Sequence, residues 1–192
     1  DGPVVVDRDA RRSAPLVDRA VAAGLMAAGR DVVDIGLATT PATQVAVEEL
    51  HAAGGVILTA SHNPAEWNAL KFLSGRGEFL DAETGAAVKC RYESGEALWV
   101  AFDRLGSESA DPRALEWHLK RVLGLSFIDV PAIRRRKLSA VVDGCASVGG
   151  VAVPRLLREL GCDVVELDCA PNGHFTRVLE PLAEHLGALG AA

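Results

Sequence analysis

The fold is decided by one stretch of the chain, Gly54-Gly55-Val56-Ile57-Leu58-Thr59-Ala60-Ser61-His62-Asn63-Pro64. Its segment from Val56 to Ala60 is a continuous run between turn-forming residues, which is typical of a strand buried on both faces. The two glycines before this run are expected to end a preceding helix, and reactive polar side chains follow it directly. The stretch therefore predicts a covered strand that leads into a polar loop at the edge of a sheet.

Strands and helices alternate on both sides of this stretch. Before it, a strand is predicted over residues 4–6, a helix over 13–28 with Ser13 as its N-cap, a strand over 32–35 and a helix over 40–53. After it come the apolar segment 71–73, helices over 83–93, 112–123, 131–136 and 150–160, strands over 138–142 and 164–167, and a helix that starts at Pro181. This alternation predicts a layered α/β fold.

The length and a weak internal repeat indicate two domains. A chain of 192 residues is long enough for one large or two small domains. The order strand, helix, strand that begins at Val5-Val6-Asp7 recurs at Val141-Val142-Asp143, although any α/β protein can produce such a match by chance. A stretch rich in glycine, serine and glutamate separates the copies at residues 106–109. We therefore expect domains at residues 1–108 and 109–192.

Composition and charge exclude several classes of protein. The formal net charge is −6, from 26 acidic and 20 basic residues, and neither half of the chain is basic, which argues against a nucleic-acid partner. The apolar runs are far shorter than the roughly 20 residues of a membrane-spanning helix, so we expect no membrane partner and a cytoplasmic location.

The four cysteines show neither a C-x-x-C pair nor zinc-ligand spacing, and we expect buried, reduced thiols. The basic run 134–137 is expected to end a helix.

The densest cluster of reactive side chains lies at residues 59–64. Ligands of open α/β sheets bind outside the carboxyl ends of the strands, which is where this loop is predicted to lie. Ser61 is a candidate nucleophile, His62 a candidate acid, base or phosphate contact, and Lys71 a cation on the next apolar segment. The alternative is a polar turn in which the serine and asparagine side chains cap the backbone.

Three common catalytic loops do not match this sequence. The residues around Ser61 differ from the G-x-S-x-G motif of α/β hydrolases. The chain has no G-x-x-x-x-G-K-[ST] phosphate loop, and residues 144–150 lack the G-x-G-x-x-G dinucleotide motif. These comparisons argue against a hydrolase of that class and against a nucleotide-binding enzyme.

The region around Ser61 carries a more specific resemblance. It reads Thr59-Ala60-Ser61-His62-Asn63-Pro64 followed by Trp67-Asn68-Ala69-Leu70-Lys71-Phe72, and it resembles the active-site serine segment of the α-D-phosphohexomutases, the family of phosphoglucomutase, phosphomannomutase and phosphoglucosamine mutase. Residues 5–13 are similar to the family's G-R-D-x-R-x-S segment, with Asp7 where glycine is usual. Residues 34–41 are similar to the strand and T-P helix start that follow, and residues 172–186 resemble a segment of the family's second domain.

The resemblance implies a mutase that interconverts hexose 1-phosphate and hexose 6-phosphate. Ser61 would carry a phosphoryl group, give it to the hexose phosphate and take one back from a hexose bisphosphate intermediate. Lys71 would supply a positive charge and exchange a proton with the sugar, while His62 and Asn63 would donate to phosphoryl or sugar oxygens. These roles agree with the needs of phosphoryl transfer, which depends on positioning and on cationic stabilisation.

Two arginines precede the first helix, and the resemblance places them near the same site. Arg11, and with a weaker case Arg8, would lie on the strand-end loop beside Ser61 and join the catalytic residues. The alternative for both is ordinary pairing with Asp7, Asp9 or Asp18.

The resemblance also implies Mg²⁺, which Ser61 would bind through its phosphoryl oxygen. The family's Asp-rich D-x-D-x-D-R loop does not occur in this sequence, so the other ligands are expected outside the chain. We therefore expect a layered, mixed α/β sheet flanked by helices in a first domain, followed by an incomplete second α/β domain of similar topology. The remaining domains of the same polypeptide would be partners, and this chain would be inactive by itself. The alternatives are a non-catalytic relative that binds sugar phosphates and an unrelated α/β enzyme that uses Ser61 and His62 differently.

Overall fold

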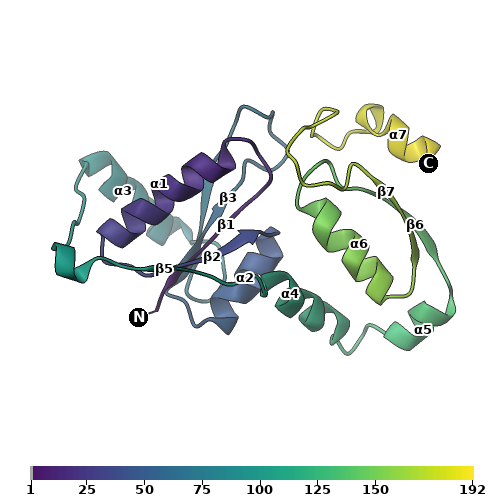
Figure 1. The fold of residues 1–192 in the computed structure, drawn as a ribbon, viewed down its shortest axis with the longest axis horizontal. Helices are drawn as coiled ribbons and strands as arrows, with labels where there is room; N and C mark the ends of the chain where they lie inside the picture. The colour runs from purple at the N-terminus through teal and green to yellow at the C-terminus, as the bar shows by residue number, and fades with distance from the viewer. Residues whose placement is uncertain (1) are drawn as a thin grey trace.

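A computed structural model describes residues 2–192 and shows two α/β units (Figure 1). The first unit contains a five-stranded sheet made of β1 (Val4–Arg8), β2 (Val32–Leu37), β3 (Gly54–Leu58), β4 (Leu70–Ser74) and β5 (Glu108–Ala110). Its helices are α1 (Ala14–Ala27), α2 (Thr40–Glu49) and α3 (Ala82–Ser94), and a 3-10 helix follows at Phe102–Arg104. The second unit contains a sheet of two strands.

The larger sheet is mixed, with its strands in the order β4-β3-β1-β2-β5. β1 pairs in parallel with β2 and β3, and β2 pairs in parallel with β5. Parallel neighbours need a long connection, which α1 and α2 provide for the first three strands. β4 follows β3 through a loop and pairs with it in the antiparallel direction, so that Lys71 lies opposite Ile57. The predicted mixed sheet is therefore confirmed.

Helices cover both faces of the larger sheet and create its core. On one face, Ala22 of α1 packs with Val56 and Leu58 of β3. On the other face, Ala46 of α2 packs with Ile57. Successive side chains of a strand point to opposite faces of its sheet, so β3 can contribute to both layers. Every residue of β3 is buried, as the apolar run predicted.

The two glycines before the apolar run belong to β3, so the prediction that they end a helix is wrong. Helix α2 already ends at Glu49, and β3 occupies residues 54–58. A Cβ atom at Gly54 would lie 2.6 Å from the carbonyl oxygen of Leu73, and one at Gly55 would lie 3.0 Å from Cγ2 of Val47. Glycine is needed at these positions because β4 and α2 approach the strand so closely.

The second unit repeats the β-α-β order of the first. Its strands β6 (Ser139–Asp143) and β7 (Asp163–Leu167) pair in parallel and are connected by α6 (Gly149–Glu159). β1, α1 and β2 have the same arrangement, so the predicted similarity of topology is confirmed. Two short helices complete the second unit, α5 (Val130–Arg135) and α7 (Gly187–Ala191).

The helix predicted from Pro181 does not form. A 3-10 helix at Ala183–His185 and the short α7 take its place. The carbonyl oxygen of Glu180 accepts the N–H of Leu182 at 2.9 Å and lies 2.8 Å from Nδ1 of His185. These contacts close a tight turn, which a helix running from Pro181 could not make.

Helix α4 (Ala114–Leu123) lies between the two sheets in the sequence but packs with the first unit. Ala114 is part of the core beside α2, and Trp117 packs against it. β5 also belongs to the larger sheet, because it pairs with β2. The predicted division after residue 108 stays a proposal, and this packing favours a division after α4.

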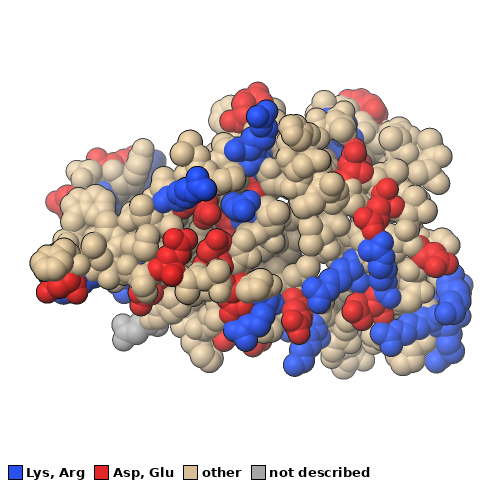
Figure 2. All heavy atoms as spheres, viewed as in Figure 1, with Lys and Arg blue, Asp and Glu red and all other residues tan. Residues whose placement is uncertain are grey.

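The basic run 134–137 coincides with a helix end, as predicted, because α5 ends at Arg135. The guanidinium of Arg134 donates two hydrogen bonds, of 2.9 and 2.7 Å, to the carbonyl oxygen of Glu159. Glu159 is the last residue of α6, so this cation lies at the negative end of that helix dipole. Figure 2 shows basic side chains gathered over the region where Figure 1 places α5.

The exposure of the cysteines differs from the sequence prediction. All four cysteines are free, but Cys90 is exposed and the other three are half-buried, so the expectation of buried thiols is wrong. Cys90 lies on α3, a helix that buries none of its residues. Within residues 2–192, no helix combines the length and the apolar character needed to cross a bilayer.

Asp7, near the carboxyl end of β1, is a buried carboxyl group. It is 1% exposed, and neither of its side-chain oxygens has a hydrogen-bond partner among the described residues. Burial is the main reason that the pKa of Asp7 is raised well above its ordinary value. The nearby Thr43 hydroxyl, which donates to the carbonyl of Thr39 at 3.2 Å, opposes this rise in part, and the carboxylates of Asp9, Asp18 and Asp34 add to it. The position therefore favours a neutral side chain.

We expect Asp7→Asn to stabilise the protein more at high pH than at low pH. Because the pKa of Asp7 is raised in the folded state, the folded chain keeps a proton that the unfolded chain releases above about 3.8. The wild-type free energy of unfolding then falls as the pH rises toward the folded pKa, whereas the variant lacks this loss. Urea unfolding at about pH 4 and about pH 8 measures the difference between the two proteins.

The matched control is Asp31→Asn, which should have the opposite sign. The N–H and hydroxyl of Ser107 both donate to Asp31 at 2.8 Å, and these bonds lower the pKa of Asp31. The variant should therefore lose stability at high pH. An Asp7→Asn protein that is no more stable than wild type at about pH 8 would contradict the assignment.

Candidate active site

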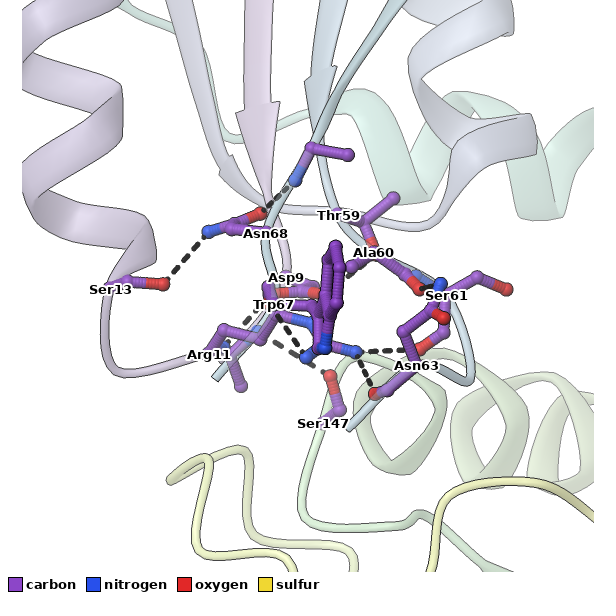
Figure 3. Close-up of polar contacts among 12 residues, drawn as sticks. Asp9, Arg11, Ser13, Thr59, Ala60, Ser61, Asn63, Trp67, Asn68 and Ser147 are labelled. Atoms are coloured by element: carbon purple, nitrogen blue, oxygen red, sulfur yellow. Dashed lines mark hydrogen bonds and ion pairs between the residues drawn. The ribbon is translucent and has the colours of Figure 1, made fainter. Parts of the chain in front are cut away.

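Two loops meet at the carboxyl edge of the larger sheet, where the sequence predicted a site. The arginine loop (Asp9–Ser13) follows β1, and the serine loop (Thr59–Ala69) follows β3. The loops are adjacent because β1 and β3 are parallel neighbours, and the N–H of Asp9 continues the pairing by donating to the carbonyl of Leu58 at 3.0 Å. Figure 3 shows the arginine side chain that connects them.

The guanidinium of Arg11 is buried inside the serine loop and uses all five of its N–H groups. Nε donates to Asp9 Oδ2 at 3.1 Å. The other four donate to backbone carbonyl oxygens of the serine loop, at 2.6 Å to Pro64, 2.9 Å to Trp67, 2.9 Å to Ser61 and 2.8 Å to Asn63. No donor is left for a substrate, so the structure makes Arg11 a positioning residue. The pairing with Asp9 that the sequence left as an alternative is present.

A chain of hydrogen bonds continues from Arg11 to the backbone of Ser61. Asp9 Oδ2 also accepts the hydroxyl of Thr59 at 2.6 Å. The hydroxyl oxygen of Thr59 in turn accepts the N–H of Ser61 at 3.1 Å. Arg11 and Asp9 together therefore hold both the N–H and the carbonyl group of Ser61.

Ser61 has a strained backbone, with φ of 56° in the left-handed region. This conformation costs a non-glycine residue roughly 1–3 kcal/mol and persists only where the surroundings impose it. The bonds from Arg11 and to Thr59 supply that constraint. Their effect is to present the Ser61 side chain, which is exposed, beyond the end of the strand.

Two asparagines stabilise the serine loop from within. The amide of Asn63 donates to the carbonyl of Ala60 at 2.8 Å, so in this structure it supports the loop that was predicted to use it on substrate oxygens. The amide of Asn68 donates to the hydroxyl of Ser13 at 3.0 Å. Ser13 is the N-cap residue of α1, as predicted, but its side chain makes no capping bond and instead accepts this bond from the serine loop.

The second unit docks on the arginine loop. The ring of Phe175 lies 5.5 Å from the guanidinium carbon of Arg11, within the range of a cation–π contact. Gly173, with φ of 69°, lies so close to Ala10 that a Cβ atom would be 2.0 Å from the Ala10 carbonyl oxygen. The N–H of Ala10 donates to Ser147 of the second unit at 3.4 Å. Figure 3 shows Ser147 reaching the site from that side.

A cavity of about 310 Å³ lies between the two units beside Ser61. Its walls come from both units and consist of Asp9, Ser61, His62, Cys145, Ser147, Phe175, Leu179 and Pro181. A larger cavity of about 640 Å³ shares His62, Phe175 and Leu179 with it. The pKa of the Cys145 thiol is raised, mainly by burial, which favours the unreactive thiol form.

His62 lies between these two cavities. Its Nδ1 is 3.5 Å from Ser61 Oγ, and its Nε2 is 3.2 Å from a carboxylate oxygen of Glu180 in the second unit. Lys71, by contrast, lines an apolar groove between β4 and α3 together with Phe72 and Tyr92. The structure therefore brings Ser61, His62, Asn63 and Arg11 together, and the predicted role of Lys71 stays a prediction.

Sequence reasoning names Asp9 only as a possible ion-pair partner of the arginines and assigns no role to Thr59, Phe175 or Glu180. Asp9 and Thr59 lie inside the two sequence motifs that contain Arg11 and Ser61. Their position in these motifs was the signal that could have identified them as site residues. Phe175 and Glu180 lie far along the chain from Ser61, and only the docking of the second unit brings them to the site.

The described residues do not by themselves form a metal site. Within residues 2–192, no group of three or more His, Cys, Asp and Glu side chains could hold a metal ion. Asp9 is the carboxylate that lines the cavity with Ser61, and its two oxygens already accept hydrogen bonds from Arg11 and Thr59.

The fold and the site define a class, an α/β/α protein with an exposed, constrained serine at the carboxyl edge of its sheet. Two family models match the chain. Residues 1–98 match "Phosphoglucomutase/phosphomannomutase, alpha/beta/alpha domain I", and residues 117–192 match domain II of the same family. The chain belongs to the phosphoglucomutase/phosphomannomutase family, as the resemblance around Ser61 predicted.

Similar proteins agree with this assignment. A phosphoglucomutase/phosphomannomutase of Thermococcus kodakarensis is 40% identical over 187 residues, which cover 95% of this chain and 40% of that protein. A probable phosphoglucosamine mutase of Methanosarcina acetivorans is 36% identical, over 98% of this chain and 42% of that protein. A phosphoglucomutase/phosphomannomutase family structure from Burkholderia thailandensis has a TM-score of 0.80 and 29% identity, covering 100% of this chain and 42% of that one. The chain thus spans about 40% of the length of these relatives.

We expect Arg11→Lys to lower the free energy of unfolding by roughly 2–4 kcal/mol, because lysine keeps the positive charge but has three N–H donors in place of five and leaves buried carbonyls without a donor. Urea unfolding measures this loss. Limited proteolysis should also cut the serine loop faster in the variant. The control is Arg8→Lys, which alters a partly exposed ion pair with Asp18 at 3.8 Å and should change the stability by less than about 1 kcal/mol. Equal losses in the two variants would contradict the role of Arg11.

Proposed function

We propose that this chain is the amino-terminal part of a phosphohexomutase that interconverts hexose 1-phosphate and hexose 6-phosphate. The observation that carries the proposal is the constrained Ser61, whose backbone is fixed on both sides while its side chain reaches a cavity. Membership of the phosphoglucomutase/phosphomannomutase family supports the same reaction. Phosphoryl transfer depends mainly on accurate positioning of the attacking oxygen and on electrostatic stabilisation of the phosphoryl group. The fixed backbone of Ser61 is consistent with accurate positioning of its hydroxyl oxygen.

In the proposed reaction, Ser61 accepts and returns a phosphoryl group. A bond forms between Ser61 Oγ and phosphorus while the bond from phosphorus to the sugar oxygen of a hexose bisphosphate breaks, and the hydroxyl proton of Ser61 ends on the released sugar oxygen. The reverse step phosphorylates the other end of the hexose. The Nδ1 atom of His62 lies 3.5 Å from Ser61 Oγ, and we assign this side chain to the proton exchange.

The other predicted residues receive separate roles in this proposal. Arg11 acts by holding the serine loop and not by contact with substrate. Asn63 holds the turn of the loop through Ala60, and its remaining amide capacity is directed to phosphoryl oxygens. Lys71 would reach the sugar from β4 as a cation and a proton donor.

In this proposal Mg²⁺ would be held partly by Ser61 and otherwise by residues outside this chain. Ser61 could contribute one ligand, a phosphoryl oxygen, when it is phosphorylated. The described residues around it supply no further carboxylate set, because Asp9 is engaged by Arg11 and Thr59. We therefore assign no step of the reaction to the ion.

We expect Ser61 to become phosphorylated when the full-length enzyme is incubated with glucose 1,6-bisphosphate and Mg²⁺. Mass spectrometry of the peptide that contains Ser61 measures the modification. Ser61→Ala should lose both the modification and the mutase activity, by roughly 10⁴-fold or more, because the covalent route is removed. Ser126→Ala, a change in the exposed turn before α5, serves as the control.

Two results would count against the proposal. An unmodified Ser61 together with full activity of Ser61→Ala would exclude a phosphoserine enzyme. Binding of hexose phosphates without turnover by the full-length protein would favour a non-catalytic relative that binds sugar phosphates.

We expect the 192-residue chain alone to have negligible mutase activity, because it spans about 40% of the length of its relatives and its described residues include no group of side chains that could hold the proposed Mg²⁺. A coupled assay that follows glucose 6-phosphate formation measures this. Full-length enzyme at the same concentration is the positive control. Turnover by the isolated chain at more than about 1% of that rate would overturn the prediction.

A further inference from the structure

His62 is contacted from both sides by residues that belong to different units. On the side of the first unit, its Nδ1 is 3.5 Å from Ser61 Oγ. On the side of the second unit, its Nε2 is 3.2 Å from Glu180 Oε2. The three side chains therefore form a line from carboxylate to imidazole to hydroxyl. Carboxylates commonly orient histidines that serve a hydroxyl group in this way.

The backbone of Glu180 is held firmly enough to orient a partner. Its carbonyl oxygen accepts the N–H of Leu182 at 2.9 Å and lies 2.8 Å from Nδ1 of His185. Pro181, which follows, lines the cavity beside Ser61. Glu180 is therefore anchored at the edge of the cleft, and its side chain spans the gap to the serine loop.

The ion pair itself contributes little to the docking of the units. The side chains of His62 and Glu180 are 58% and 42% exposed, and such exposed pairs add little to stability because water screens them. Docking has other and better buried contacts, in which Gly173 packs on Ala10 and Phe175 lies on the buried guanidinium of Arg11. The distinctive effect of Glu180 is on the orientation of the imidazole ring.

Orientation matters because the two edges of an imidazole ring are different. With Nε2 toward the carboxylate, the ring presents Nδ1 to Ser61 Oγ, whereas a ring turned over would present a carbon atom. Without Glu180, an exposed His62 side chain would sample both arrangements and other rotamers. A carboxylate partner selects one ring orientation, as carboxylates do for histidines at metal sites.

We propose that Glu180 is a positioning residue that acts through His62 on phosphoryl transfer at Ser61. The inference rests on the proposed function and adds that the second unit completes the serine site of the first. Glu180 needs no contact with the substrate for this role. Its removal should slow the transfer step and leave the apparent affinity for the hexose bisphosphate nearly unchanged.

The first experiment measures the orientation of His62 without any substrate. Nuclear Overhauser contacts between the His62 ring and the β protons of Ser61 are recorded for the wild type, Glu180→Ala and Glu184→Gln. Glu184 pairs with His185 at 3.5 Å on the same segment, and among residues 2–192 it has no ion pair with the serine loop, so its variant is the matched control. We expect the ring contact to persist in the control and to weaken at least about twofold in Glu180→Ala.

The second experiment measures phosphorylation of Ser61 by glucose 1,6-bisphosphate in the full-length enzyme under single-turnover conditions. We expect Glu180→Ala to lower the rate constant roughly 10- to 100-fold, with half-saturation within about twofold of wild type. Glu180→Gln keeps an oxygen that can accept from the imidazole and should recover a large part of the rate. Glu184→Gln should react at the wild-type rate.

A double-mutant cycle separates positioning from a structural role. If Glu180 acts through His62, Glu180→Ala should cause no further loss in a His62→Ala background. Additive losses, or a wild-type rate and ring contact in Glu180→Ala, would overturn the inference. If Ser61 stays unmodified in the wild-type enzyme, the proposed function is wrong and this inference is wrong with it. If Ser61 is phosphorylated at the same rate in the wild type and in Glu180→Ala, only this inference is wrong.

Discussion

The buried guanidinium of Arg11 is the constraint on which the site depends. Burying a cation is costly unless every donor is satisfied, and Arg11 meets this condition with one carboxylate and four carbonyl oxygens. The planar guanidinium fixes those carbonyls relative to one another, which a lysine could not do. The serine loop is therefore rigid enough to keep Ser61 in a strained conformation that the residue would not adopt alone.

The same guanidinium also connects the two units. Its edge is occupied by the serine loop, while its face is covered by Phe175 of the second unit. Gly173 allows the second backbone to approach Ala10, where any side chain would collide. The serine site is consequently a property of the assembled pair of units, and the contact between Glu180 and His62 follows from that docking.

The motif predicts which residues lie near Ser61, and the structure shows what some of them contact there. Ser61, His62, Asn63 and Arg11 were all named from the sequence, and the structure brings them together. The motif does not show that four N–H groups of Arg11 donate to backbone carbonyl oxygens, or that the amide of Asn63 donates to the carbonyl of Ala60. These roles depend on where loop carbonyls point, which residue type alone does not encode. Gly54 and Gly55 are a second example of roles that residue type does not encode. The sequence predicts a helix end there, whereas in the structure the two glycines leave room for the close approach of β4 and α2.

The sequence by itself determined the alternation of strands and helices, the buried strand β3 and the identity of the serine segment, because these depend on local periodicity and on residue type. Tertiary structure alone decided which groups meet at Ser61. The four bonds from Arg11 to the serine loop cross 50 to 56 positions of the chain, and the carboxylate partner of His62 comes from the other unit. Such contacts are set by strand pairing and by the docking of the two units, and no local pattern in the chain records them.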